Sequence, residues 1–217
     1  MKLIIGNKNY SSWSLRAWLL LQTFKLPFEE ILIPLDTPTT TQQIRRYSKA
    51  ERVPVLLDGD LVIWDSLAIC EYVSETWLSG RAWPADPAAR AQARCAAAEM
   101  HSGFAALRNQ MPMNCRAVGR KVATTPELSR DIQRIDELWN DLRLAHGGSG
   151  HWLCGDFGIV DCMFAPVVFR FNTYGVQLSE VSQSYMKNVM KLASMQQWLA
   201  DARAESAVID ADEAGSQ

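Results

Sequence analysis

The stretch ERVPVLLDGDLVIWDS, residues 51–66, decides how the first part of this chain folds. It holds two short apolar runs, 55–57 and 61–63, on either side of Asp58-Gly59-Asp60. Asp-Gly between two apolar runs is a strong signal for a β-hairpin. The stretch therefore predicts two neighbouring antiparallel strands, and any sheet that contains them has at least one antiparallel pair.

Pro54 stands directly before the first of these strands, where proline cannot donate a hydrogen bond to the ladder. Two interpretations are open. Pro54 begins an edge strand, or it follows a cis peptide bond that turns the backbone of Val53 outward. In the second case the N–H and C=O of Val53 would pair with an extended ligand, as an added strand would.

The end of the stretch places Asp65 and Ser66 just before helical periodicity that continues to residue 77. Ser66 can cap that helix. The same helix end offers unpaired N–H groups and partial positive charge to an anion, while Asp65 could hold an ammonium group. A ligand that carries a carboxylate beside an amine would suit this pair.

The segments around this stretch alternate between strand and helix. Short apolar runs at 2–5 and 28–33 predict strands, and spacing at 13–24 and 39–47 predicts helices. The order is β-α-β-α-β-β-α, which predicts a small α/β domain with a mixed sheet over residues 1–79.

The rest of the chain has a different pattern of residues, with helical periodicity and no strand signals. Residues 80–86 are rich in turn formers and predict a linker. Helical patterns follow without strand signals, so an all-helical domain is expected over residues 87–217, with a frayed acidic tail from residue 210. The expected helices lie at 88–109, 126–146, from near 158, 181–190 and 195–204.

Composition excludes several classes of protein. The net charge of −2 gives no basis for nucleic-acid or membrane-surface binding. No apolar run is long enough to span a bilayer or to form a signal-peptide core, so a cytoplasmic protein is expected. The five cysteines form no Cys-x-x-Cys pair and the three histidines are scattered. Reduced thiols and no metal site are expected.

A cluster of hydroxyls precedes the first helix in YSSWSLR, residues 10–16. Ser11, Ser12 and Ser14 can cap the helix. The alternative is that one of them performs chemistry at the helix N-terminus, where partial positive charge stabilises an anion.

Taken together, these features resemble the glutathione transferase family. The resemblance rests on the serine cluster, on Val53-Pro54, on WDSLAICEYVSE (64–75) and on LCGDFGIVDCMFAP (153–166), which is similar to the family's helix-capping segment. It implies a thioredoxin-like N-terminal domain followed by a helical-bundle domain, a homodimer, and glutathione as cosubstrate. The serine stretch is most similar to the zeta class.

The sequence departs from the family pattern at three places. Trp13 stands where the zeta pattern has cysteine, which weakens the case for a zeta-type isomerase. Residues 49–51 replace the usual Pro-x-Gly. Gly158 stands at the N-cap that is usually Ser or Thr, although Asp161 can still accept from the cap backbone N–H, so we expect a structural role for Asp161.

The resemblance assigns roles residue by residue. Ser11 is expected to donate a hydrogen bond to the glutathione thiolate, with Ser12 as the alternative, and Arg16 can reinforce the positive field or form a salt bridge. Val53 is expected to bind the cysteinyl backbone, and Arg52 to reach the glycyl carboxylate. Asp65 and Ser66 are expected to hold the γ-glutamyl end.

The electrophile site is expected in EMHSGFAALRNQMPMNCR, residues 99–116, where Pro112 ends a helix. An adaptable apolar lining is possible here because methionine fits irregular shapes, although a Met-rich helix end is also typical of a core. Arg116 is an alternative to Arg108 for attracting an acidic substrate. The residues assigned to the substrate are Phe104, Arg108, Met111 and Met113.

Three functions remain open from the sequence. The first is a transferase that conjugates or reduces small electrophiles. The second is an isomerase of the maleylacetoacetate type that uses glutathione. The third is a binding protein that has the fold but no catalysis.

Overall fold

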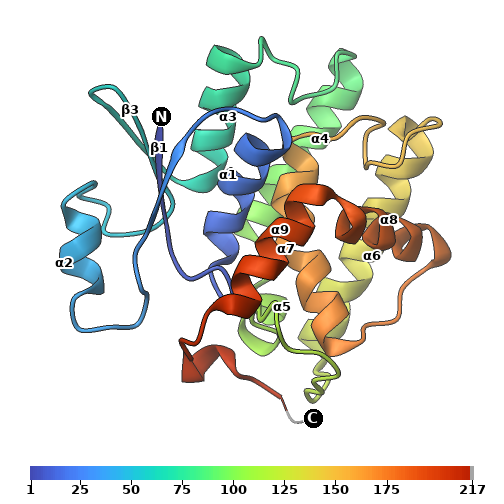
Figure 1. Ribbon diagram of the computed structural model, residues 1–217. Coiled ribbons are helices and arrows are strands. Elements are labelled where there is room, and N and C mark those ends of the chain that lie inside the picture. The colour runs from blue at the N-terminus through green and yellow to red at the C-terminus, as the bar shows by residue number, and fades with distance from the viewer. Residues whose placement is uncertain (216–217) are drawn as a thin grey trace.

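The computed structural model describes residues 1–215 and contains one four-stranded sheet beside a large group of helices (Figure 1). The strand order is β2-β1-β3-β4. β1 pairs in parallel with β2 and antiparallel with β3, which pairs antiparallel with β4. The strands are β1 (Lys2–Ile5), β2 (Glu29–Leu32), β3 (Val55–Asp58) and β4 (Leu61–Trp64). The predicted mixed sheet and hairpin are confirmed.

Side chains that alternate along the strands divide the sheet into two apolar faces. Leu3 and Ile5 of β1 join the main core with α1 (Ser12–Thr23) and α3 (Ser66–Trp77). Ile4 points the other way and packs in a smaller cluster with Ile44 of α2 (Thr40–Arg45). The period of two in a strand explains why one short run serves both faces.

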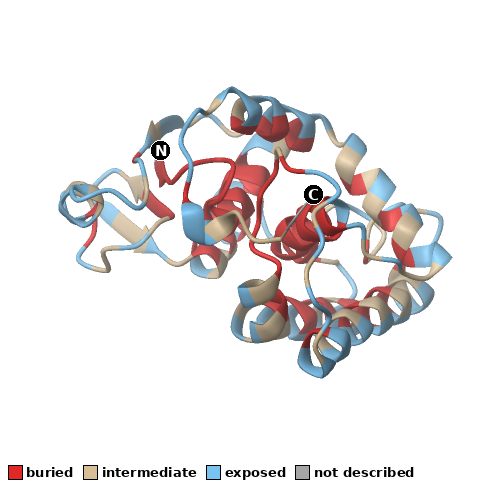
Figure 2. Ribbon diagram, turned by 90° about the horizontal axis from the view of Figure 1, so that it is seen from below, coloured by how far each residue is buried: buried red, intermediate tan, exposed pale blue. Residues whose placement is uncertain are grey.

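The second half of the described chain is helical, and α7 forms its centre. Nearly every residue of α7 is buried, and the helix packs against α1, α4 and α8. Figure 2 shows buried ribbon through the middle of the molecule and exposed faces on the outer helices. The helices are α4 (Pro87–Ser102), α5 (Ala105–Gln110), α6 (Pro126–His146), α7 (Ile159–Tyr174), α8 (Glu180–Lys191) and α9 (Ala193–Ala204). An α/β sheet unit followed by an all-helical unit is therefore confirmed as the fold class.

The expectation of one helical stretch over residues 88–109 is wrong. The chain breaks between α4 and α5, where Phe104 has a φ of 58° and adopts the left-handed conformation. One distant side chain and one nearby side chain stabilise the new helix ends. Asp131 accepts a hydrogen bond from the Leu107 N–H at 2.9 Å, and Arg108 donates to carbonyls at the end of α4. Helical periodicity cannot reveal such distant partners.

The expectation of a frayed tail from residue 210 is also wrong for the described residues. A short 3-10 helix, η1 (Asp210–Asp212), leads to Glu213, whose carboxylate accepts from Tyr10 Oη at 2.6 Å and from Arg120 Nη2 at 2.6 Å. Tyr10 and Arg120 lie far from Glu213 in sequence. The acidic composition of the tail could not reveal these contacts, and by itself it suggested a free end. Residues 216–217 of the predicted tail lie outside the described residues.

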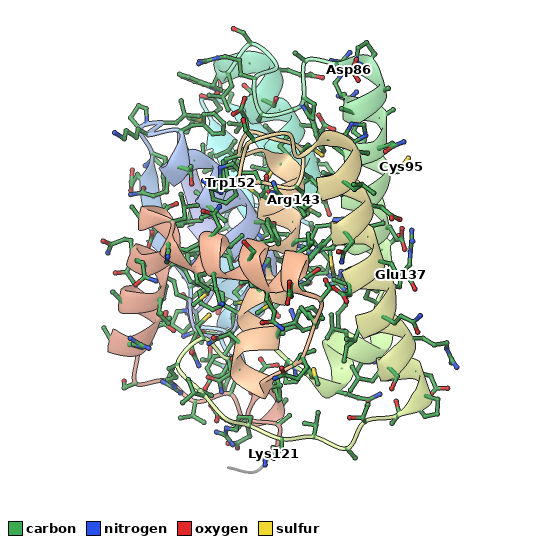
Figure 3. The ribbon with its side chains drawn as sticks, turned by 90° about the vertical axis from the view of Figure 1, so that its right-hand side faces the viewer. Asp86, Cys95, Lys121, Glu137, Arg143 and Trp152 are labelled. Atoms are coloured by element: carbon green, nitrogen blue, oxygen red, sulfur yellow. The ribbon has the colours of Figure 1, made fainter. Side chains whose placement is uncertain are left out.

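The loop between α6 and α7 is fixed from both of its ends. Figure 3 labels Arg143 on α6 and Trp152 in this loop, and Arg143 Nη1 donates to the Trp152 carbonyl at 2.7 Å. Asp161, in the first turn of α7, accepts from the Gly158 N–H at 2.9 Å and from the Leu153 N–H at 3.1 Å. The structural role predicted for Asp161 is therefore visible in the fold. No helix of residues 1–215 is long and apolar enough to cross a membrane.

Candidate functional site

Val53 lies where two cavities meet, on the side of the sheet unit that faces the helical unit. The Val53–Pro54 bond is cis, so the second interpretation of this proline is the correct one. Within residues 1–215, neither the N–H nor the C=O of Val53 has a backbone hydrogen-bond partner. Val53, Arg52 and Trp13 line both cavities.

The first cavity has a volume of about 550 Å³ and brings together all four residues that the sequence assigned to glutathione. Ser66 Oγ is buried and has no hydrogen-bond partner within the described chain. Buried polar atoms are normally satisfied, so this hydroxyl lacks a group that a ligand could supply. The four residues are Arg52, Val53, Asp65 and Ser66.

The carboxylate of Asp65 has contacts on both oxygens. Oδ1 accepts from the N–H groups of Leu67 and Ala68 and so caps α3. Oδ2 lies 3.0 Å from Nε2 of His101, which comes from α4. Burial lowers the pKa of His101, and Arg16 and Arg108 lower it further, whereas Asp65 opposes this effect. Asp65 thus joins the sheet unit to the helical unit at the cavity wall.

The second cavity, of about 460 Å³, contains both candidate serines. Ser11 is the N-cap of α1, and its hydroxyl donates to Ser14 Oγ at 2.7 Å. Ser14 Oγ also accepts from the Gly6 N–H at 3.1 Å, which fixes this pair. Ser12 begins α1, lines the cavity, and shows no side-chain hydrogen bond with any residue of 1–215. Its hydroxyl proton is therefore available, whereas that of Ser11 is engaged.

Trp13 separates these cavities and lies against two guanidinium groups. The Cζ atoms of Arg16 and Arg108 lie 4.3 Å and 4.7 Å from the centre of its ring. The His101 ring meets the indole edge-on, with ring centres 5.3 Å apart. Trp13 is 36% exposed.

Arg16 is completely buried, and none of its three side-chain nitrogens has a hydrogen-bond partner within the described chain. Burial lowers its pKa well below the usual range, and the nearby charges of Arg108 and Arg170 lower it further. A buried ion without a partner typically costs several kcal/mol. The contact with Trp13 compensates only part of that cost, since a cation–π pair is worth about 1–2 kcal/mol.

The residues assigned to the electrophile are divided between different places. Arg108 and Met113 line the serine cavity. Met111 lines a separate cavity beside α6, and Phe104 is buried in the core at the start of α5. Arg116 donates to Tyr10 Oη and to carbonyls of the chain after α9. The structure therefore brings two of the four together with Ser11 and Ser12.

Several cavity residues were missed by sequence reasoning. His101 is one of the three scattered histidines for which no metal site is expected, and no local motif marks its contact with Asp65. Arg170 and Asp212 line the serine cavity from α7 and η1. Both lie more than a hundred residues from the serines, and only the packing of α7 against α1 brings the first of them near.

Two family models match the chain. The N-terminal domain of glutathione S-transferase matches residues 10–76, and the C-terminal domain of the same family matches residues 87–204. The chain belongs to the glutathione S-transferase family. The resemblance inferred from the serine cluster, Val53-Pro54 and the helix-capping segment is thereby confirmed.

Individual glutathione S-transferase relatives are distant. A stringent starvation protein A homologue of Haemophilus ducreyi is 22% identical over 79% of this chain and 78% of its own length. A probable maleylacetoacetate isomerase of Vibrio cholerae is 25% identical over 82% of this chain and 86% of its own. A glutathione transferase homologue from Burkholderia, crystallised with bound glutathione, is 22% identical, covers 94% and 98% of the two chains, and has a TM-score of 0.72. This last likeness shows the fold.

Proposed function

We propose that this protein is a glutathione transferase that activates the thiol of glutathione through a serine hydroxyl for attack on small electrophiles. The observation that carries the proposal is the free hydroxyl of Ser12 at the N-terminus of α1, in a cavity that it shares with the unpaired backbone of Val53. Membership of the glutathione S-transferase family supports the choice of glutathione.

The residues of this chain fit glutathione along its length. The N–H and C=O of Val53 can pair with the cysteinyl backbone as a neighbouring strand would. The unpaired Ser66 hydroxyl and the N-terminus of α3 can take the γ-glutamyl carboxylate, with Asp65 beside them for the ammonium group. Arg52 is exposed at the junction of the two cavities and can reach the glycyl carboxylate.

Glutathione supplies the nucleophile, so the protein needs only to favour the thiolate. A free thiol has a pKa of about 8.5, and lowering it by about two units stabilises the thiolate by roughly 2.7 kcal/mol. A hydroxyl that donates to sulfur favours the charged form, as does the positive end of α1. The position and free hydroxyl of Ser12 support this role for it. The resemblance to the zeta-class stretch favours Ser11 instead, but the Ser11 proton goes to Ser14.

Serine-to-alanine variants test this assignment. Ser12→Ala should raise the thiol pKa of bound glutathione toward its free value and lower kcat/KM by about tenfold to a hundredfold near neutral pH. Ser11→Ala should change the thiol pKa little but destabilise the fold by about 1 kcal/mol, because it removes the N-cap of α1. Thiolate absorbance against pH measures the first effect, and urea unfolding measures the second.

Ser12→Thr serves as the control, because it keeps a hydroxyl at the same place. If Ser12→Ala binds glutathione with an unchanged thiol pKa, Ser12 is not the donor. If Ser11→Ala then shows the raised pKa, the original choice of Ser11 is correct.

A second candidate is glutathione-dependent isomerisation of the maleylacetoacetate type. Arg108 and Arg170 line the serine cavity, and their positive charges favour a substrate with carboxylates. The similarity to the Vibrio cholerae relative points the same way. Trp13 in place of cysteine argues against it. Turnover of an aryl halide and of maleylacetoacetate, measured side by side, separates the two activities.

Retention on glutathione resin tests the third possibility, a binding protein without catalysis. The similarity to stringent starvation protein A homologues is the reason to test it. Retention with neither turnover would favour this possibility over both enzymes. We also propose that the protein is a homodimer of the cytoplasm. Its five cysteines are free thiols, which is typical of a reducing compartment.

A further inference from the structure

Arg16 is a charged group that the proposed mechanism does not use. Its Nε, Nη1 and Nη2 atoms are all buried without a hydrogen-bond partner in residues 1–215. Two other buried cationic side chains have partners. Lys8 pairs with Glu30 and Asp201, and Arg170 donates to the Met111 carbonyl at 2.8 Å. An unpaired guanidinium destabilises the fold without ligand, and an anion that reached it would recover that loss.

The indole of Trp13 contacts both Arg16 and the cavities. It stacks on the Arg16 guanidinium, and it also forms part of the wall of both cavities. Trp13 is partly exposed and lies in the first turn of α1. This one side chain therefore touches Arg16 and also forms part of the wall of both cavities.

The charges around the indole favour an anionic ligand. Arg108 lies against the same ring, and Arg170 is close enough to lower the pKa of Arg16. Among the described residues, the acids in the two cavity walls are Asp65, whose oxygens are already engaged by the N-terminus of α3 and by His101, and Glu51 and Asp212 of the serine cavity. Burial and the two arginines lower the pKa of His101, whereas Asp65 raises it. The ligand is expected to be a carboxylate, because its two oxygens match the fork of a guanidinium.

We propose that Arg16 is a carboxylate-binding residue and that the indole of Trp13 is the gate through which the carboxylate reaches it. The carboxylate has two possible sources, an anionic electrophile or, in place of its proposed contact with Ser66, the γ-glutamyl end of glutathione. The choice of sources rests on the proposed function, whereas the gated site rests on the geometry alone.

Malonate, a small dicarboxylate, is the probe for the gated site. Calorimetric titration of the full chain at constant ionic strength should show saturable binding. Arg16→Met should weaken it by about tenfold or more, because the charged fork is lost. Trp13→Ala should tighten it several-fold, because the gate is removed. Arg203→Met, at an exposed arginine of α9, makes the same change in charge and should bind malonate like the wild type.

Thermal melting of the Arg16 variants distinguishes a loss of malonate binding from a loss of folding. Without malonate, Arg16→Met should melt at or above the wild-type temperature, because it removes an unpaired buried charge. If that variant does not fold, Arg16→Lys keeps the charge without the fork and should still bind malonate more weakly than the wild type. The proposal is overturned if malonate does not bind, or if a folded Arg16 variant binds it as the wild type does.

Two further titrations identify the source of the carboxylate. If it is the γ-glutamyl end, Arg16→Met weakens glutathione binding and leaves cysteinylglycine binding unchanged. If it is the electrophile, Arg16→Met leaves glutathione binding unchanged, and malonate competes with an anionic electrophile. Malonate binding at Arg16 without any glutathione binding would reject the proposed function and leave the gated site standing.

Discussion

At the scale of single residues, the most informative side chains here are polar groups in unusual surroundings. Ser12, Ser66 and Arg16 differ from ordinary surface groups because they line or adjoin the cavities and lack partners in the described chain. Polar groups that are buried and unsatisfied usually have a functional reason. Their identities were visible in the sequence, but their lack of partners was not.

Asp161 leads to a prediction about pH. Burial raises the pKa of its carboxyl to about 6, despite hydrogen bonds from Leu153, Gly158 and Tyr185 that lower it. The folded state therefore holds this proton in a pH range where the unfolded state has lost it. Between about pH 4 and pH 6, stability falls as pH rises, by roughly 2–3 kcal/mol from this group.

Asp161→Asn isolates that contribution, because an amide does not titrate. The difference in the free energy of unfolding, wild type minus variant, should decrease by roughly 2–3 kcal/mol between pH 4 and pH 8. The amide places an N–H against the Gly158 N–H, so the variant pays a further cost that does not depend on pH. Urea unfolding across this range measures the difference, and a constant difference would contradict the raised pKa.

At the scale of elements, the connection between residues 80–86 and α7 depends on a close backbone contact. The Ile159 N–H donates to the Ala82 carbonyl at 2.9 Å, next to the cap residue Gly158. A Cβ atom at Gly158 would lie 2.7 Å from the same carbonyl oxygen. Glycine therefore replaces the usual serine or threonine cap because the linker passes too close for a side chain.

Gly158→Ser tests this explanation by restoring the hydroxyl cap. A serine in place of glycine at an N-cap gains only a few tenths of a kcal/mol, whereas crowding of packed backbone costs about 1–3 kcal/mol. The variant should therefore lower the free energy of unfolding by roughly 1–2 kcal/mol. Thr125→Gly at the α6 cap is the control and should cost only a few tenths. A Gly158→Ser protein more stable than the wild type would rule out the steric explanation.

At the scale of the whole molecule, buried polar groups join the sheet unit to the helical unit. Lys8 pairs with Glu30 of β2 and with Asp201 of α9, and its ammonium group lies over the rings of Trp18 and Trp198. This contact spans nearly the full length of the chain. It fixes the loop before the serine cluster against the helical unit.

The exposed apolar side chains near the sheet edge lead to a prediction about assembly. Leu61 and Trp64 of edge strand β4 are 48% and 57% exposed, and Trp77 at the end of α3 is 42% exposed. Exposed apolar groups along an unpaired sheet edge are typical of an interface. Leu61→Glu should convert the proposed homodimer into a monomer, because a charge would be buried there without a partner.

Light scattering after gel filtration measures the mass of each variant. Leu144→Glu on α6 is the matched control, because Leu144 is 91% exposed outside this surface and its change should leave the dimer intact. A wild-type protein that is monomeric, or a Leu61→Glu protein that stays dimeric, would exclude this interface.

The sequence by itself determined the order of elements as far as α4, whereas the candidate glutathione residues came from the resemblance to the glutathione transferase family. Local patterns were sufficient, because the Asp-Gly turn, the β-branched runs and the serine caps act over a few residues. The break at Phe104 and the docked tail at Glu213 were missed, since each depends on side chains from distant elements.

The tertiary structure alone decided how the candidate side chains are used. The Ser12 hydroxyl has no hydrogen-bond partner within residues 1–215, whereas that of Ser11 is engaged by Ser14, three residues along the chain. Packing of α1, α3 and α4 against α7 buries Arg16 beneath Trp13 and brings His101 to Asp65. Whether a polar group has a partner depends on neighbours from the whole chain, so no local pattern could have determined it.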